Sequence, residues 1–140
     1  MSDESLLAGR RILIVEDEIM VAWALEDILT GIGCVIVGPA ARLNQALAMI
    51  ETEVIDVALL DINLNGEKSY LIADALGARG VPFVFSTGSR QDCMPDGYQQ
   101  FPLLQKPFSG EKLAEALAKL LVQKVPEDAR KPPRRRNKDE

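Results

Sequence analysis

Acidic residues follow two of the short apolar runs in this sequence. Glu16 and Asp17 come directly after residues 12–15, and Asp61 comes directly after residues 54–60. Clustered carboxylates repel one another and therefore favour a hard cation, and ligand sets made of oxygen alone select Mg²⁺ over zinc. A carboxylate can also act as a nucleophile and form an aspartyl-phosphate. The three acids therefore predict a site that binds magnesium and handles a phosphoryl group.

A hydroxyl and an ammonium group follow two later apolar segments. Thr87 comes two positions after residues 83–85, and Lys106 comes directly after residues 101–105. A lysine ammonium neutralises a phosphoryl oxygen as a point charge, and a threonine hydroxyl donates a hydrogen bond to another oxygen. Each residue alone is common in a turn or at a surface. Together with the carboxylates they predict phosphoryl transfer to an aspartate, driven mainly by positioning and charge neutralisation.

The elements that must position these side chains alternate along the chain. We expect strands at residues 12–15, 34–37, 54–60, 83–85 and 101–105, because nearly continuous apolar runs fit strands buried on both faces of a parallel sheet. The intervening segments have helical period. Their apolar stripes are Val21, Leu25, Ile28 and Leu29; Leu43, Leu47 and Ile50; Leu71, Ala75 and Ala78; and Leu113, Leu117, Leu120 and Leu121.

This alternation predicts an α/β fold, a doubly wound sheet of five parallel strands in the flavodoxin-like order 2-1-3-4-5, or (βα)5. The last helix is expected over residues 110–124 with Ser109 as its N-cap. Residues 91–100 contain Pro95 and Gly97, so we expect a short or mobile helix there. Ligands of such sheets bind at the carboxyl ends of the strands, where all the polar residues named above converge.

Composition excludes several other classes of protein. The 140 residues suit one domain, and 47% hydrophobic with 26% charged residues is typical of a folded soluble protein. The absence of histidine excludes Ser-His-Asp and Cys-His catalysis, His-ligated zinc and a phosphohistidine on this chain. Cys34 and Cys93 are too few for a disulfide framework. Without a signal peptide or a membrane span, the expected location is the cytoplasm.

Charge and proline content divide the chain into three parts. The net charge of −5 argues against a nucleic-acid surface. We expect an N-terminal extension over residues 1–9, a folded domain over residues 10–124 and a disordered charged tail over residues 125–140. The tail holds Arg134, Arg135 and Arg136, which we interpret as a solvated segment rather than a nucleic-acid contact.

The polar strand ends resemble the motifs of the response-regulator receiver domain (CheY-like) of two-component signalling. The resemblance covers roughly residues 10–124. The motifs stand here as Ile12-Leu13-Ile14-Val15-Glu16-Asp17-Glu18, Leu59-Leu60-Asp61-Ile62-Asn63-Leu64, Phe85-Ser86-Thr87-Gly88 and Lys106-Pro107-Phe108. Residues 82–88 also resemble a subgroup of stand-alone receivers that carry Phe-Ala-Thr-Gly at this place.

The resemblance implies a role for each site residue. Asp61 would be the phospho-acceptor, and Glu16, Asp17 and Asp61 would hold Mg²⁺ together with the backbone carbonyl of Asn63. Thr87 would be the switch hydroxyl and Lys106 the phosphate-sensing lysine. The protein would then be no enzyme beyond its own phosphorylation and slow dephosphorylation, and Mg²⁺ would be its cofactor.

Besides residues 82–88, the chain departs from the usual receiver pattern at two further places. Leu64-Asn65 replaces the common Met-Pro after the acceptor, which removes no ligand. Leu103 stands where many receivers carry a switch tyrosine or phenylalanine, and this departure fits the subgroup.

Met20 and Trp23 lie off the core stripe of the first helix, near the active rim. They serve either to dock a helical phosphodonor or as partly covered structural residues.

The resemblance implies partners as well. They would be a sensor histidine kinase of the HWE or a related class, or a histidine phosphotransfer protein, and an unknown downstream protein, with neither nucleic acid nor membrane. The expected protein is a single-domain response regulator that signals through a conformational switch in its protein contacts. A docking module with a vestigial site and a phosphate sink without output remain alternatives. A Mg²⁺-dependent phosphatase is disfavoured, because Asn63 stands where those enzymes place a general-acid aspartate.

Overall fold

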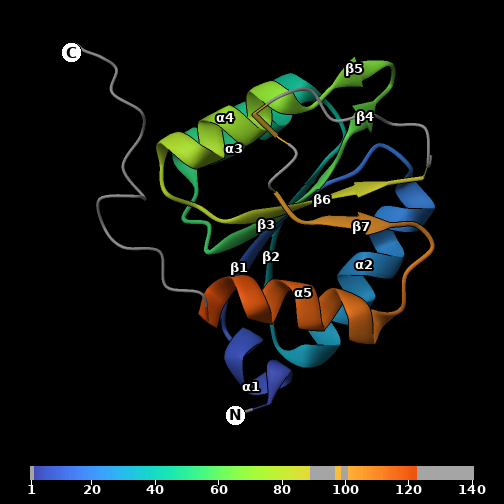
Figure 1. The fold of residues 1–140 in the computed structure, drawn as a ribbon, viewed down its shortest axis with the longest axis vertical. Coiled ribbons are helices and arrows are strands. Elements are labelled where there is room, and N and C mark those ends of the chain that lie inside the picture. The colour runs from blue at the N-terminus through green and yellow to red at the C-terminus, as the bar shows by residue number, and fades with distance from the viewer. Residues whose placement is uncertain (1, 89–96, 99–100, 123–140) are drawn as a thin grey trace.

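A parallel sheet forms the centre of the molecule. The computed structural model describes residues 2–88, 97–98 and 101–122 (Figure 1). The sheet of the described part has the order β2-β1-β3-β6-β7, all pairs parallel. Its strands are β1 (Arg11–Val15), β2 (Val35–Ala40), β3 (Val57–Asp61), β6 (Phe83–Thr87) and β7 (Leu103–Gln105). In chain order this is 2-1-3-4-5, which confirms the predicted doubly wound fold.

Helices cover both faces of the sheet. On one face lie α2 (Ile19–Ile32) and α5 (Gly110–Val122), and on the other lie α3 (Leu43–Thr52) and α4 (Tyr70–Ala78) (Figure 1). No helix in the described part of the chain has both the length and the apolar character that crossing a membrane requires. The helix expected over residues 91–100 and the charged tail over residues 125–140 lie outside the described residues.

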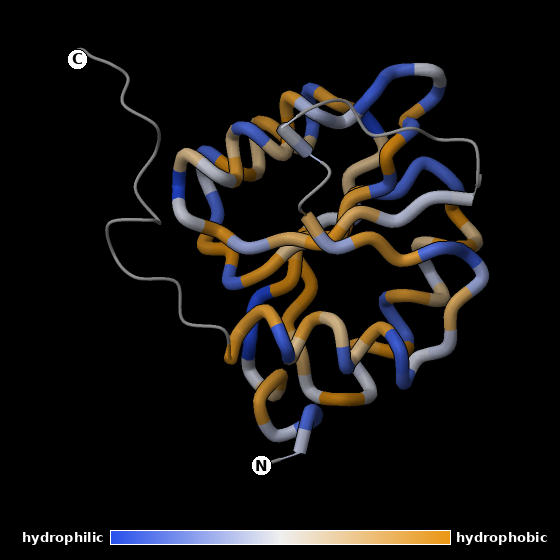
Figure 2. Tube along the Cα trace, viewed as in Figure 1, coloured by the Kyte–Doolittle hydropathy of each residue, from blue (hydrophilic) through white to orange (hydrophobic). Residues whose placement is uncertain are grey.

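The central strands are buried because they are apolar on both sides. Every residue of β3 and β6 is buried, and in β1 only Arg11 is not. Figure 2 shows the hydrophobic colouring concentrated in this layer and in the helix sides that face it. Side chains alternate across the sheet, so that Leu60 and Phe85 join the core under α3 and α4 while Leu59 joins the core under α2 and α5.

Three strands differ clearly from their predicted bounds. The strand expected at residues 54–60 begins at Val57, because Val54 is exposed and precedes the sheet. The strand expected at residues 34–37 continues to Ala40, and its burial falls off at several positions because β2 lies at the edge of the sheet. The strand expected at residues 101–105 is shorter and begins at Leu103.

The predicted apolar stripe of α4 was wrong at Leu71 and Ala78, whereas Ala75 packs against the core as predicted. Leu71 is 59% exposed and Ala78 is exposed, whereas Ile72 and Leu76 are fully buried. Both stripes satisfy helical spacing, so periodicity does not distinguish them. The observed face buries Ile72 and Leu76, which together remove more apolar area from water than the one leucine and two alanines of the predicted stripe would.

A small hairpin and an N-terminal helix add to the predicted fold. The strands β4 (Asn63–Leu64) and β5 (Glu67–Lys68) pair antiparallel around Asn65 and Gly66, whose φ angles of 50° and 87° are those that a tight Asn-Gly hairpin turn requires. The helix α1 (Asp3–Leu7) lies within the expected N-terminal extension and packs against α5, and its Leu7 is fully buried.

Candidate phosphorylation and magnesium site

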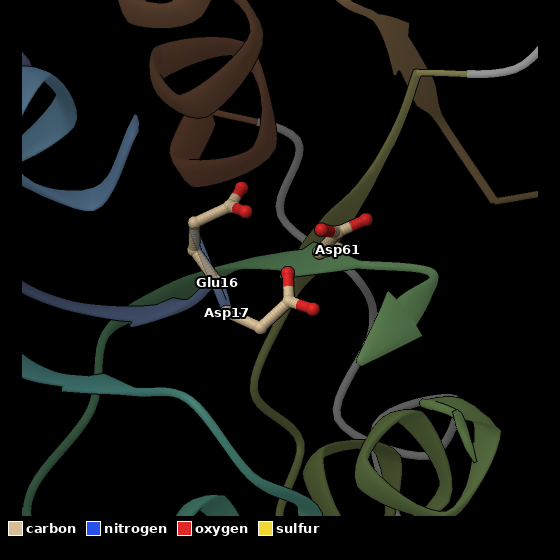
Figure 3. Close-up of side chains that lie close together, drawn as sticks. All are labelled: Glu16, Asp17 and Asp61. Carbon is tan, nitrogen blue, oxygen red and sulfur yellow. The ribbon is translucent and has the colours of Figure 1, made fainter. Parts of the chain in front are cut away.

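The parallel register of the central strands brings the acids together. Val15 of β1 lies opposite Leu60 of β3, so Glu16 and Asp61 leave the sheet side by side. One carboxylate oxygen each from Glu16, Asp17 and Asp61 lies within 4.8 Å of the others. Figure 3 shows the three carboxylates gathered at the carboxyl ends of β1 and β3. The predicted convergence at this rim is therefore observed.

The donor chemistry of this group fits a magnesium ion. All three ligands are carboxylate oxygens, and Glu16 and Asp61 are buried. Hard oxygen donors close together suit Mg²⁺, which binds through one or two carboxylates while keeping water and phosphate oxygens as its remaining ligands. Asn63 begins β4, two residues beyond Asp61, and its carbonyl remains a predicted ligand.

Lys106 bridges two of the buried carboxylates. Its Nζ donates to Glu16 Oε1 at 2.8 Å and to Asp61 Oδ2 at 3.3 Å. The lysine follows β7 directly, and its backbone N–H donates to the carbonyl of Thr87 at 2.8 Å. The pairing of β6 with β7 therefore places the Lys106 ammonium beside Glu16 and Asp61, where it provides a positive charge opposite the two carboxylates.

Burial shifts the proton affinities of this cluster. Burial raises the pKa of Glu16 to about 7, with a further rise from the charge of Asp61, while the hydrogen bond from Lys106 opposes the shift. Burial also raises the pKa of Asp61, against the charge and hydrogen bond of Lys106. For Lys106 burial acts in the opposite sense, but its contacts with the two carboxylates outweigh it and raise the pKa. Such shifts concentrate at functional sites.

Two backbone N–H groups orient the first two acids. Glu18 N–H donates to Glu16 Oε2 at 3.1 Å, and Asn65 N–H donates to Asp17 Oδ2 at 2.9 Å. The second contact comes from the turn of the β4–β5 hairpin, which sequence reasoning missed as an element. Its signal was present, because Asn-Gly is the strongest short hairpin turn.

Thr87 lies at the same rim as Asp61. It is the last residue of β6, and it is buried. Its neighbour Ser86 lies opposite Asp61 in the register of β3 and β6, and the Ser86 carbonyl accepts the N–H of Ile62 at 3.0 Å. The threonine therefore stands one residue beyond the register partner of the predicted phospho-acceptor. Its role as the switch hydroxyl remains a prediction.

An apolar patch flanks the acids at the beginning of α2. Trp23 is 55% exposed, and Ile19 and Met20 are exposed as well. Positions 19, 20 and 23 share one side of a helix, and α2 begins one residue after Glu18. The prediction that Met20 and Trp23 lie off the core stripe is confirmed, and Ile19 extends the patch they form.

Comparison with known families gives a match over most of the chain. The sequence model of the response regulator receiver domain matches residues 12–118. No curated protein matches this chain in sequence. Solved structures give further relatives.

The fold and sequence are similar to SdrG from Sphingomonas melonis Fr1, with 46% identity, a TM-score of 0.73 and coverage of 87% of this chain and 100% of that chain. A structure of the BeF3-activated conformation of SdrG, from Pseudomonas melonis Fr1, has 46% identity and a TM-score of 0.70, covering 82% of this chain and 98% of that one. The response regulator PhyR from Brucella abortus has 27% identity and a TM-score of 0.73, covering 85% of this chain and 50% of PhyR. The chain therefore belongs to the family of response regulator receiver domains, which serve in phosphorelay signalling.

Proposed function

We propose that Asp61 accepts a phosphoryl group from a phosphohistidine of a sensor histidine kinase or a histidine phosphotransfer protein. The observation that carries this proposal is the ammonium of Lys106, which donates to both Glu16 and Asp61 at the rim where three carboxylates meet. A carboxylate beside a fixed cation and further carboxylates combines a nucleophile with counter-charge for a phosphate.

The proposed reaction replaces one bond to phosphorus by another. An oxygen of the Asp61 carboxylate forms a bond to the phosphorus atom, the bond between phosphorus and the histidine nitrogen breaks, and the nitrogen keeps the electron pair. Lys106 neutralises one phosphoryl oxygen, and the Thr87 hydroxyl donates to another. Little covalent chemistry is left for the protein, so the rate depends on the positions of these groups.

Magnesium completes the proposed site. Glu16, Asp17 and Asp61 would hold the ion together with the backbone carbonyl of Asn63. When bound, Mg²⁺ supplies positive charge between the carboxylates and the phosphoryl oxygens. The N–H of Asn65 keeps Asp17 oriented at this site.

The apolar patch of Ile19, Met20 and Trp23 is the proposed docking surface for the phosphodonor. The patch is exposed beside the acids, so a helix that presents its histidine to Asp61 would cover it. A kinase of the HWE or a related class is the proposed donor. The output would be a change in contacts with a downstream protein, and the protein would catalyse only its own phosphorylation and slow dephosphorylation.

A second candidate is a docking module whose acidic site no longer accepts phosphate. The exposed Trp23 favours it as much as it favours a phosphorylated receiver, because an apolar patch serves either purpose. A phosphate sink without output would share the chemistry of Asp61 and differ only in lacking a downstream protein.

Intact-mass spectrometry separates the first two candidates. The full chain and the Asp61→Asn variant are incubated with acetyl phosphate, with and without Mg²⁺. One phosphoryl adduct that needs Mg²⁺ and is lost in Asp61→Asn supports the proposal. If the wild type gives no adduct and beryllofluoride with Mg²⁺ leaves its spectra unchanged, the docking module is the better assignment.

A further inference from the structure

Five aromatic rings pack together on the face of the sheet that α3 and α4 cover. They are Tyr70, Phe83, Phe85, Tyr98 and Phe101, here called the ring cluster. The ring centroids of Tyr70 and Tyr98 lie 4.7 Å apart, and those of Phe83 and Phe101 also lie 4.7 Å apart. The first pair is stacked and the second is tilted, and both separations are those of favourable aromatic contacts.

The ring cluster shares a strand with Thr87. Phe83, Phe85 and Thr87 stand at alternate positions of β6, so their side chains leave the same face of the sheet. Phe85 N–H donates to the carbonyl of Pro102 at 3.0 Å, and the Thr87 carbonyl accepts from Lys106 N–H at 2.8 Å. A movement of the end of β6 would therefore displace both Lys106 and the ring cluster, because packed interiors transmit small displacements.

Tyr98 adds a second contact between this cluster and α4, which already contributes Tyr70, in edge-on contact with Phe85 at a centroid separation of 6.0 Å. The ring of Tyr98 stacks on Tyr70 and meets Phe85 edge-on at a centroid separation of 6.5 Å. Its hydroxyl donates to Asp74 Oδ1 of α4 at 2.7 Å. Tyr98 belongs to the connection between β6 and β7, so one side chain contacts the strand of Thr87 with its ring and a helix covering that face of the sheet with its hydroxyl.

The hydroxyl bond is distinct from the packing of the ring. Asp74 is an exposed residue, and a phenylalanine at position 98 would keep the stacking on Tyr70. The bond to Asp74 raises the pKa of Tyr98 to about 12, with burial adding to the shift. The phenol thus stays protonated and able to donate over the ordinary range of pH.

Leu103 is the register partner of Phe85 in β6 and β7 and is not one of the five rings. It stands on the edge strand β7, carries no ring and is 46% exposed. Tyr98 contacts Phe85 of β6 with its ring and Asp74 of α4 with its hydroxyl.

We propose that Tyr98 is a positioning residue that links the state of Thr87 to α4, through Phe85 on one side and Asp74 on the other. This inference rests on the proposed phosphorylation of Asp61. When a phosphoryl group draws in the Thr87 hydroxyl, the end of β6 moves, Phe85 repacks against the Tyr98 ring, and the hydroxyl bond to Asp74 carries the change to α4. The surface of α4 then differs between the two states.

Hydrogen exchange of α4 tests the link. The full chain is saturated with beryllofluoride and Mg²⁺, a mimic of the phosphoryl group, and the exchange of peptides covering α4 is compared with and without the mimic. In the wild type we expect a change of exchange in α4. In Tyr98→Phe and in Asp74→Ala we expect that change to fall by about half or more.

Matched variants separate the link from a structural role. Asp74→Asn keeps an acceptor oxygen and should restore the response, and Asp27→Ala, which removes an exposed aspartate from α2, should leave it unchanged. Thr87→Val should reduce the α4 response, and adding Tyr98→Phe to it should reduce the response no further, because both residues act in one chain of contacts.

Four results would overturn the inference. In the first, Tyr98→Phe keeps the wild-type α4 response, and in the second, the losses caused by Thr87→Val and Tyr98→Phe add in the double variant. In the third, Asp74→Ala and Asp27→Ala change the response equally. In the fourth, the wild type binds the mimic without any change of exchange in α4. The proposed function is judged separately by Asp61→Asn. If Asp61→Asn shows the same beryllofluoride-induced change of exchange in α4 as the wild type, the phosphorylation site is wrongly assigned. If Asp61→Asn shows no such change while Tyr98→Phe keeps the full wild-type change, only the link through Tyr98 is rejected.

Discussion

The ammonium of Lys106 donates to Glu16 at 2.8 Å, a shorter contact than the 3.3 Å that separates it from Asp61. The nearest positive charge is thus shared unequally between a predicted magnesium ligand and the predicted phospho-acceptor. Both carboxylates are buried and repel each other, so the lysine offsets a charge that the fold would otherwise leave uncompensated.

Replacing Asp61 by asparagine should abolish the phosphoryl adduct. The amide is a poor nucleophile, while its size matches the carboxylate, so the fold should be retained. Intact mass after acetyl phosphate and Mg²⁺ measures the adduct, with Asp27→Asn as the control that should still be labelled. Labelling of Asp61→Asn at the wild-type rate would show that another group accepts the phosphate.

Replacing Lys106 by methionine should destabilise the protein near neutral pH. The variant keeps the length of the side chain but leaves Glu16 and Asp61 buried without their donor, which costs roughly 1–3 kcal/mol. Urea denaturation measures the free energy of unfolding. Lys119→Met, on an exposed position of α5, is the control and should change little. Equal stability of Lys106→Met and the wild type would mean that the ion pairs add nothing.

Stability should fall as the pH rises from about 4.5 towards 7. Burial raises the pKa of Glu16 from 4.5 to about 7, so in this range the folded state binds more protons than the unfolded state. By linkage the free energy of unfolding then decreases with pH, by no more than about 1.4 kcal/mol per pH unit for one group. The raised pKa of Asp61 acts with the same sign.

Urea denaturation between pH 5 and pH 8 checks this slope. Glu16→Gln removes the titrating group and should flatten the curve, whereas Glu26→Gln on α2 should keep the wild-type slope. A wild-type stability that rises steadily over this interval would contradict the sign given above.

Removing the N–H of residue 65 should weaken magnesium binding. Asn65→Pro deletes the donor that orients Asp17 Oδ2 and also distorts the turn, because proline holds φ near about −65° whereas φ at Asn65 is 50°. Loss of such an outer contact lowers metal affinity by about 10–100-fold. Gly66→Ala is the control for turn strain, because φ at Gly66 is 87° and the donor at residue 65 is kept. Calorimetric Mg²⁺ titration measures both, and the hairpin has no part in metal binding if Asn65→Pro binds like the wild type.

Truncating Leu7 should reveal that α1 belongs to the folded domain. Leu7 is fully buried against α5, so Leu7→Ala should lower the free energy of unfolding by about 2–5 kcal/mol. Leu71→Ala is the matched control, since Leu71 is mostly exposed and should cost little. A stability loss no greater than that of the control would mean that α1 packs only loosely.

The sequence alone determined the order of the sheet and the convergence of its polar ends. Apolar runs of strand length alternate with helical segments, and right-handed crossovers leave few arrangements for such a chain. Once the strands are parallel, residues directly after them must meet at one rim, so Glu16, Asp61, Thr87 and Lys106 could be assigned to one site. Local pattern and chain chirality carry this part of the fold.

The tertiary structure alone decided which atoms meet and which faces are buried. Lys106 donates to Glu16 across 90 positions of sequence, and the turn at Asn65 donates to Asp17 across 48. The buried face of α4 and the contact of Tyr98 with Asp74 likewise depend on how the helices pack against the sheet. Periodicity offers several faces and many partners, and close packing with satisfied hydrogen bonds selects among them.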